Sequence, residues 1–213
     1  QDPSVYSNLG LTQEKIGDTI AAINSYRQAL ELQADHPEAL SNFSYLTRKT
    51  KRLDLAEATL STVEKDENPS PYSLFHRGMV LHQLGRYQQA IAQYNQAISY
   101  FPNEADFYLQ RGFSQEKLKQ LDQALKDYSI AIKLGPTLEK AYVNRGNVYY
   151  KQRKFSLALQ DYQKALSLND QNAKVYYNLG LVYHRLHQLD EACLYLNNAL
   201  DLDHLKSLLF VYK

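Results

Sequence analysis

The sequence lacks several features that mark secreted, membrane-spanning or DNA-binding proteins. Its 213 residues include one cysteine, Cys193, so no intrachain disulfide can form. No hydrophobic run is long enough to cross a membrane. The formal net charge is only +1, which argues against an electrostatically bound partner such as duplex DNA. We therefore expect a cytoplasmic protein that neither inserts into a membrane nor binds nucleic acid.

Signals for catalysis and for metal binding are also missing. The sequence contains no glycine-rich phosphate loop and no nucleophile motif. Cys193 has no neighbouring histidine base, which favours a packing role. His184 and His187 are three residues apart, but they are expected in a groove and in a turn, and no acidic or thiol ligand has a suitable spacing. We predict a non-enzymatic protein with no cofactor and no metal.

What the sequence does contain is one 34-residue pattern that recurs six times without insertion or deletion. We assign residues 3–206 to a single domain with repeats 3–36, 37–70, 71–104, 105–138, 139–172 and 173–206. A unit of this length cannot bury its apolar face alone and must stack on its neighbours. The period therefore predicts a solenoid whose function lies in a long surface rather than in one pocket.

Small residues recur at two positions of the unit. The eighth position holds Gly10, Ser44, Gly78, Gly112, Gly146 and Gly180, and the twentieth holds Ala22, Ala56, Ala90, Ala124, Ala158 and Ala192. Glycine in a helix costs about 1 kcal/mol relative to alanine, so its recurrence indicates that a second helix approaches closely there. Gly17, Lys51, Gly85, Lys119, Arg153 and His187 separate the two helices of each unit, where glycine suits a left-handed helix end. We expect about twelve helices in antiparallel pairs and no sheet.

Several stretches resemble the tetratricopeptide repeat (TPR) family. They include YLQRG at residues 108–112, YVNRG at 142–146 and VYYNLG at 175–180, each followed twelve residues later by the alanine. The resemblance covers residues 3–206, although the second repeat departs from it with Ser44 and with Val63 at the twenty-seventh position. It implies an all-α, right-handed superhelical solenoid whose first helices line a concave groove, and a role in holding or assembling other proteins.

An apolar zone is expected where the first helices of the third and fourth repeats face the groove. The family fold implies that the second, fifth, sixth, ninth, twelfth and thirteenth positions point inward. In these two repeats such positions hold Tyr72, Phe75, Met79, Leu109 and Phe113. Neighbouring helices could bury these side chains against each other, or the side chains could anchor an apolar residue of a bound peptide.

A basic zone is expected in the fifth and sixth repeats. The inward positions there carry Lys140, Lys151, Lys174 and Arg185 and no carboxylate, although the whole chain is nearly neutral. Charges in a concave surface are screened less than charges on an open face, which favours an acidic ligand. A solvated basic face is the alternative.

A row of polar side chains occupies the sixth position: Asn8, Asn42, His76, Gln110, Asn144 and Asn178. An amide can donate to a peptide carbonyl and accept from a peptide N–H, so the row could hold extended backbone, or it could be structural. The peptide-binding residues predicted from these features, with Asn147 and Tyr177 from the other inward positions of the fifth and sixth repeats, are Asn42, Tyr72, Phe75, His76, Met79, Leu109, Gln110, Phe113, Lys140, Asn144, Asn147, Lys151, Lys174, Tyr177, Asn178 and Arg185.

The sequence thus predicts an interaction scaffold that binds a peptide segment with acidic and apolar residues in its groove. The alternative is a repeat array that self-associates through its C-terminal end, because residues 207–213 are almost wholly apolar. Those residues either start a capping helix or belong to a truncated extension, a hydrophobic end that pairs with another subunit or with a missing domain.

Overall fold

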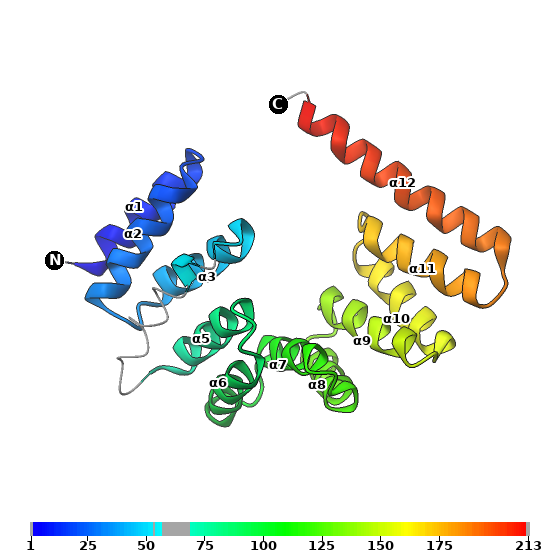
Figure 1. The fold of residues 1–213 in the computed structure, drawn as a ribbon, viewed down its shortest axis with the longest axis horizontal. Coiled ribbons are helices and arrows are strands. Elements are labelled where there is room, and N and C mark those ends of the chain that lie inside the picture. The colour runs from blue at the N-terminus through cyan, green and yellow to red at the C-terminus, as the bar shows by residue number, and fades with distance from the viewer. Residues whose placement is uncertain (1, 53, 57–68, 212–213) are drawn as a thin grey trace. The chain divides into compact units, whose positions relative to one another are not determined.

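Helices are the only regular elements in the described part of the chain. The computed structural model describes residues 2–52, 54–56 and 69–211, with side chains described as far as Asp203 (Figure 1). Residues 57–68, which include Val63 of the second repeat, lie outside the described residues. The described residues contain eleven helices with assigned bounds, a helical segment at residues 54–56 and no strand, which confirms the predicted all-α repeat array.

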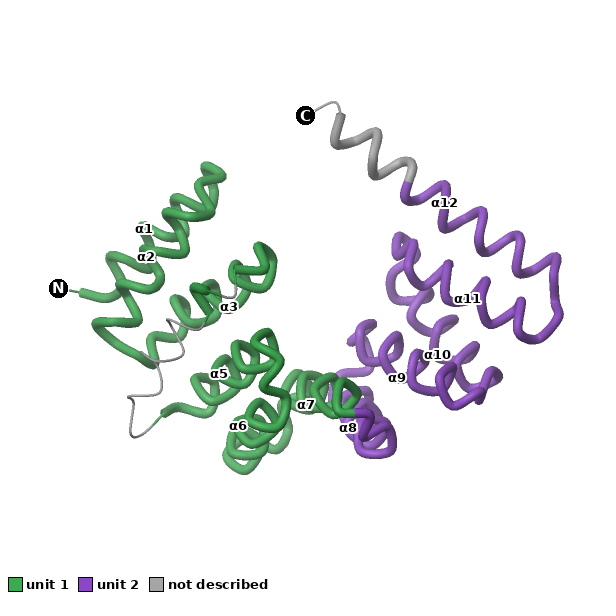
Figure 2. The backbone as a smooth tube through the Cα atoms, viewed as in Figure 1, with its two compact units in different colours: residues 1–118 green, residues 119–213 purple. Residues whose placement is uncertain are grey.

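Two compact units divide the chain, residues 1–118 and residues 119–213 (Figure 2). The first unit contains α1 (Pro3–Lys15), α2 (Thr19–Leu32), α3 (Pro37–Thr50), α5 (Pro71–Gln83), α6 (Tyr87–Tyr100) and α7 (Ala105–Lys117). The second contains α8 (Leu121–Leu134), α9 (Glu139–Lys151), α10 (Phe155–Leu168), α11 (Ala173–Arg185) and α12 (Leu189–Val211). The first helix of every repeat begins at the first position of the 34-residue pattern.

Local chemistry explains where these helices begin and end. Proline occupies the first turn of α1, α3 and α5, where its missing N–H has no intrahelical partner to lose. Asp2, Asp18 and Ser70 accept hydrogen bonds from backbone N–H groups of the first turns. All six predicted helix separators have a positive φ, between 57° and 87°, so the left-handed helix end occurs with or without glycine.

Close approach within each helix pair accounts for the recurrent glycine. A Cβ atom on Gly78 would lie 2.5 Å from Cε1 of Tyr94, and one on Gly146 would lie 2.7 Å from Cε1 of Tyr162. Both tyrosine rings are almost fully buried. The glycine therefore leaves room for the ring of the partner helix, as the sequence pattern indicated.

Successive repeats are joined by packing of a first helix on the second helix before it. In the first unit α3 packs on α2 and α7 packs on α6, and in the second unit α9 packs on α8 and α11 packs on α10. The last helix differs from the other second helices. It has 23 residues, where α10 has 14, and residues 207–211 prolong it rather than forming a further helix. Among the described helices, none has the length and apolar character needed to span a bilayer.

Candidate functional site on the first helices

The inward positions of the first two repeats line one pocket. Its volume is about 250 Å³, and it lies between α1 and α3. Six of its seven lining residues occupy the second, fifth, sixth or ninth position: Ser4, Ser7, Asn8, Leu11, Glu38 and Asn42, with His36 completing the wall. The first helices thus present the positions that the family fold assigns to the groove.

The apolar zone forms an aromatic cluster between α5 and α7. The ring of Phe75 stacks on Phe107 with centroids 4.8 Å apart, and the ring of Tyr72 meets Phe107 edge-on at 5.7 Å. Phe107, which the sequence reasoning did not single out, is buried, and Leu109 is only 2% exposed. Helix packing accounts for the burial of Phe75 and Leu109, whereas Tyr72 keeps 45% of its surface exposed.

Two histidines in this zone are buried enough to stay neutral. Burial lowers the pKa of His76 to about 4, and its Nδ1 has no hydrogen-bond partner. Burial, with the positive charges of Lys117 and Arg48, lowers the pKa of His82 to about 4 as well. The ring of His82 stacks on Phe113 at 4.5 Å.

Other groove residues of the first unit are partly covered. Met79 packs against the hydrophobic core, and Gln110 and Asn42 are half-buried. The Nζ atom of Lys117 lies 5.2 Å from the centre of the Phe113 ring. This ring therefore makes a cation–π contact in addition to its stacking on His82.

Part of the polar row joins helices of the second unit to one another. The Oδ1 atom of Asn147 accepts a hydrogen bond from Nδ2 of Asn178 at 3.0 Å and another from the Tyr162 hydroxyl at 2.7 Å. These bonds tie α9 to both α10 and α11. Asn144, one turn before Asn147 on α9, is half-buried. Asn147 and Asn178 therefore have a structural role in the unliganded chain.

Three cations meet at one end of α9 and α11. Lys151, Arg153 and Arg185 line a pocket of about 410 Å³ together with Tyr150 and Phe155. Nε of Arg185 donates to the Tyr150 hydroxyl at 3.3 Å, and the rings of Tyr150 and Phe155 lie 5.6 Å apart. The sequence analysis did not include Arg153 among the binding residues, because it belongs to the turn after α9 rather than to a first helix. Its position two residues after Lys151 could have indicated that it lies near this lysine. We call these five residues the basic pocket.

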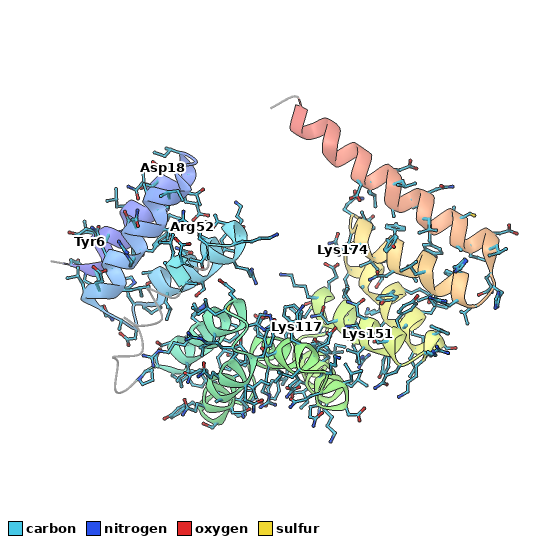
Figure 3. The ribbon with its side chains drawn as sticks, in the orientation of Figure 1. Tyr6, Asp18, Arg52, Lys117, Lys151 and Lys174 are labelled. Atoms are coloured by element: carbon cyan, nitrogen blue, oxygen red, sulfur yellow. The ribbon has the colours of Figure 1, made fainter. Side chains whose placement is uncertain are left out.

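The other two predicted cations lie at the opposite helix ends. Lys140 and Lys174 stand in the first turns of α9 and α11, eleven residues before Lys151 and Arg185. At 1.5 Å per residue, this spacing separates the two ends by about 16 Å. Figure 3 labels one lysine of each kind, Lys174 in the first turn of α11 and Lys151 at the end of α9. The predicted basic zone is therefore two separate pairs of charges.

Lys174 and Tyr177 belong to a different, mainly apolar cavity. Its volume is about 680 Å³, and it lies between α11 and α12. Its lining consists of Asn172, Ala173, Lys174, Tyr177, Leu196, Ala199, Leu200 and Asp203. No group of three or more histidine, cysteine or acidic residues suited to a metal ion occurs among the residues that the structure describes.

Sequence comparisons match this chain to repeat families and to two kinds of curated protein. A TPR repeat model matches residues 78–119, 117–153 and 147–187, and tetratricopeptide repeat models match residues 3–36 and 173–204. The Photosystem I assembly protein Ycf3 of Synechococcus sp. (strain CC9902) is 30% identical over 112 residues, which are 50% of this chain and 63% of that protein. The Sol locus transcriptional repressor of Clostridium acetobutylicum is 39% identical over 66 residues, 30% of this chain and 21% of that protein. The chain thus spans less than two thirds of each relative.

Solved structures with the same fold are more distant in sequence. MamA from Desulfovibrio magneticus RS-1 has a TM-score of 0.66 at 22% identity and covers 80% of this chain and 96% of its own. The pilF protein of Pseudomonas aeruginosa has a TM-score of 0.71 at 20% identity, covering 91% and 88%. A chain of the APC/C hetero-tetramer Cut9-Hcn1 has a TM-score of 0.77 at 16% identity, covering 94% and 40%. Because the TPR repeat model matches more than half of the chain and the helix pairs have the expected form, the protein belongs to the tetratricopeptide repeat family.

Proposed function

We propose that the chain binds a segment of a partner protein on its first helices. Acidic groups of the partner contact the second unit, and an apolar residue of the partner contacts the first unit. The observation that carries the proposal is the basic pocket. Three of its five lining residues are cationic, two are aromatic and none is acidic. A partner rich in acidic and apolar residues fits these surfaces.

Electrostatics favours carboxylates in the basic pocket. A guanidinium group binds a carboxylate through two parallel hydrogen bonds, and both Arg153 and Arg185 are exposed at the rim. The rings of Tyr150 and Phe155 exclude water from one side, so the attraction is screened less than it would be on an open surface. The pairs at the two helix ends, about 16 Å apart, suit a segment that carries acidic residues at two separated places.

Tyr72 supports the apolar contact in the first unit. Its ring is held by Phe101 and Phe107 but remains half exposed. A pre-positioned aromatic ring binds an apolar side chain without losing much rotamer freedom, which is typical of residues that dominate interface energy. Phe75 and Phe113 are half-buried members of the same predicted zone. The half-buried amides Gln110 and Asn144 are the polar-row members proposed to hold peptide backbone.

The basic pocket is tested by reversing its charge. We expect Lys151→Glu/Arg185→Glu to weaken binding of a fluorescein-labelled peptide of alternating glutamate and leucine by more than about tenfold, measured by fluorescence anisotropy. The matched control is Lys126→Glu/Lys164→Glu, which makes the same charge change at exposed positions of the second helices α8 and α10. If the two double variants weaken binding equally, only net charge matters and the pocket assignment is wrong.

The apolar contact is tested separately, because its residues lie in the other unit. Tyr72→Ala should weaken binding of the same peptide by about fivefold or more, since one exposed aromatic contact is lost. Tyr100→Ala is the control, as Tyr100 is also exposed but lies on the second helix α6. A normal affinity for Tyr72→Ala would remove the anchor from the proposal and leave the basic pocket standing.

The alternative expected from the sequence, self-association, uses a surface other than the groove. The exposed leucines Leu189 and Leu200 on α12 favour it.

A further inference from the structure

The turn between α9 and α10 carries an arginine where the fold needs only a left-handed residue. Arg153 has a φ of 59°, and the same position of the first and third repeats holds Gly17 and Gly85, with φ of 87° and 75°. Glycine adopts this conformation without strain, whereas a Cβ atom makes it unfavourable. A cation near the end of α9 complements the helix dipole, but Lys151 in the last turn already supplies one. The turn and the helix end therefore do not explain the arginine.

Arg153 and its neighbours concentrate positive charge in the basic pocket. Lys151, Arg153 and Arg185 line the pocket, and none of its lining residues is acidic. The carboxylate of Asp122 accepts a hydrogen bond from Gln152 but is not part of the lining. A ligand group with one negative charge would neutralise only one of the three cations. The pocket therefore suits a group that carries more than one negative charge.

The hydrogen-bond donors of the pocket also suit a ligand group with more than two oxygen atoms. Nε of Arg185 donates to the Tyr150 hydroxyl at 3.3 Å, which orients the guanidinium plane and leaves the N–H groups of its terminal nitrogens for a ligand. Because the Tyr150 oxygen accepts this bond, its own O–H can donate in another direction. The ring of Phe155 lies 5.6 Å from the Tyr150 ring and restricts its position. Guanidinium, ammonium and hydroxyl donors thus line one space of about 410 Å³.

We propose that the acidic group bound in the basic pocket is a phosphate monoester on a side chain of the partner segment. The assignment rests on the proposed function and names the ligand of its site in the second unit. A phosphorylated side chain carries a charge of about −1.5 to −2 at pH 7 and three acceptor oxygens, whereas a glutamate carries a single charge on two oxygens. Guanidinium groups bind phosphate through paired hydrogen bonds, and the pocket presents the guanidinium groups of Arg153 and Arg185. Phosphorylation of the partner therefore strengthens its binding to this chain.

A flexible segment fits this site better than a membrane surface does. The phosphate has to enter a pocket among α9, α10 and α11, beside the rings of Tyr150 and Phe155. The pocket volume lies within the range of about 300–1,000 Å³ that is typical of small-ligand sites. A side chain of a peptide can reach into such a pocket, whereas the headgroups of a bilayer form a flat array. A lipid phosphate is therefore included in the test as the competing source of the same group.

Three peptides distinguish a phosphate from ordinary negative charge. The first is the fluorescein-labelled peptide of alternating glutamate and leucine, and the second carries phosphoserine in place of its central glutamate. The third has one leucine replaced by glutamate, so that its net charge nearly equals that of the second. Fluorescence anisotropy with the 213-residue chain should show that the phosphoserine peptide binds at least about tenfold more tightly than either of the others. Equal affinity of the second and third peptides would overturn the proposal, because net charge alone would then explain the binding.

Arg153→Gly removes the guanidinium group without straining the turn. Glycine occupies this position in the first and third repeats, so the helicity and the urea midpoint should equal or exceed those of the wild type. The advantage of the phosphoserine peptide should fall to about threefold or less. Lys119→Gly is the matched control, because Lys119 has a φ of 61° at the same position of the fourth repeat, is exposed and does not line the pocket. An advantage that survives Arg153→Gly, or that Lys119→Gly lowers equally, would contradict the proposal.

Two further results separate the phosphate assignment from the proposed function and from membrane binding. If the glutamate peptide binds and Lys151→Glu/Arg185→Glu weakens its binding, but phosphoserine gives no advantage, the proposed function stands and the phosphate assignment fails. If neither peptide binds, both fail. Phosphatidylcholine vesicles that contain phosphatidic acid present a phosphate monoester on a lipid. Co-sedimentation with these vesicles that Arg153→Gly abolishes, together with no advantage for the phosphoserine peptide, would assign the pocket to a lipid and overturn the proposal.

Discussion

Replacing Gly146 by alanine tests whether glycine at the eighth position makes room for the partner helix. The new methyl group would lie 2.7 Å from Cε1 and 3.0 Å from Cδ1 of Tyr162. The ring cannot swing outward, because Tyr162 is 1% exposed. Its hydroxyl also donates to Oδ1 of Asn147 at 2.7 Å, so any shift of the ring strains that hydrogen bond.

Three contributions set the size of the effect. Forcing an extra carbon into a packed core costs about 1–3 kcal/mol. Loss of the hydrogen bond from Tyr162 to Asn147 adds about 1 kcal/mol. Against these, alanine stabilises a helix by about 1 kcal/mol relative to glycine. We therefore expect Gly146→Ala to lower the free energy of unfolding by about 1–3 kcal/mol.

Urea denaturation, monitored by the circular dichroism of the helices, measures this change. Making the same substitution in a second variant identifies its cause. In a Tyr162→Ala background the clash is absent, so Gly146→Ala should raise stability by up to about 1 kcal/mol. Gly85→Ala is a control without a clash, because no atom lies within 4 Å of the added carbon and only the positive φ of 75° opposes the change. The close-approach explanation fails if Gly146→Ala stabilises the wild type, or if its effect is the same in both backgrounds.

Further predictions follow from buried polar groups. Since burial lowers the pKa of His76 to about 4, the unfolded state binds more protons below pH 6.5. The contribution of His76 to stability should therefore be constant above about pH 6.5 and fall by up to about 3 kcal/mol towards pH 4, and His76→Gln should reduce the slope by this amount in urea titrations against pH. Asp161→Asn should cost about 3 kcal/mol in urea, because it removes the charge paired with the half-buried Arg145 and leaves one acceptor for the two hydrogen bonds, 2.7 and 2.8 Å long, that Arg145 donates. Asn147→Ala should cost about 1–3 kcal/mol in the same assay, as two donors lose their shared acceptor.

The helix boundaries could be predicted from the sequence because local chemistry and the period agree. Proline or a capping side chain stands at the start of several helices, and the helix separators recur every 34 residues. Lys51 and Arg153 adopt the left-handed conformation although neither is glycine, so the period was a better guide to this conformation than the residue type.

The groove could be predicted less well, because exposure at its positions depends on the neighbouring repeat. The fifth position is half exposed at Tyr177 but nearly buried at Leu109. Phe75, at the same position, is partly covered by Phe107 from the next first helix, and a smaller residue in place of Phe107 would leave it open. The basic zone could be located only in part: the spacing of eleven residues between Lys174 and Arg185 already separates the two helix ends, whereas Arg153 joins the basic pocket from a turn outside the inward positions.

The same dependence on neighbours explains why two residues at one repeat position can differ in burial. Val5 and Val175 occupy the same position in almost identical hexapeptides, yet one is 62% exposed and the other is fully buried. Local sequence therefore cannot predict the burial of such a residue, because the helices that pack on each valine determine it. For this reason Val5→Glu should leave the fold intact, whereas Val175→Glu would place a charge inside a joint between repeats and disrupt folding itself. We expect a large difference in stability between the two variants in urea denaturation, and equal losses would show that burial at this position does not depend on the neighbouring repeat.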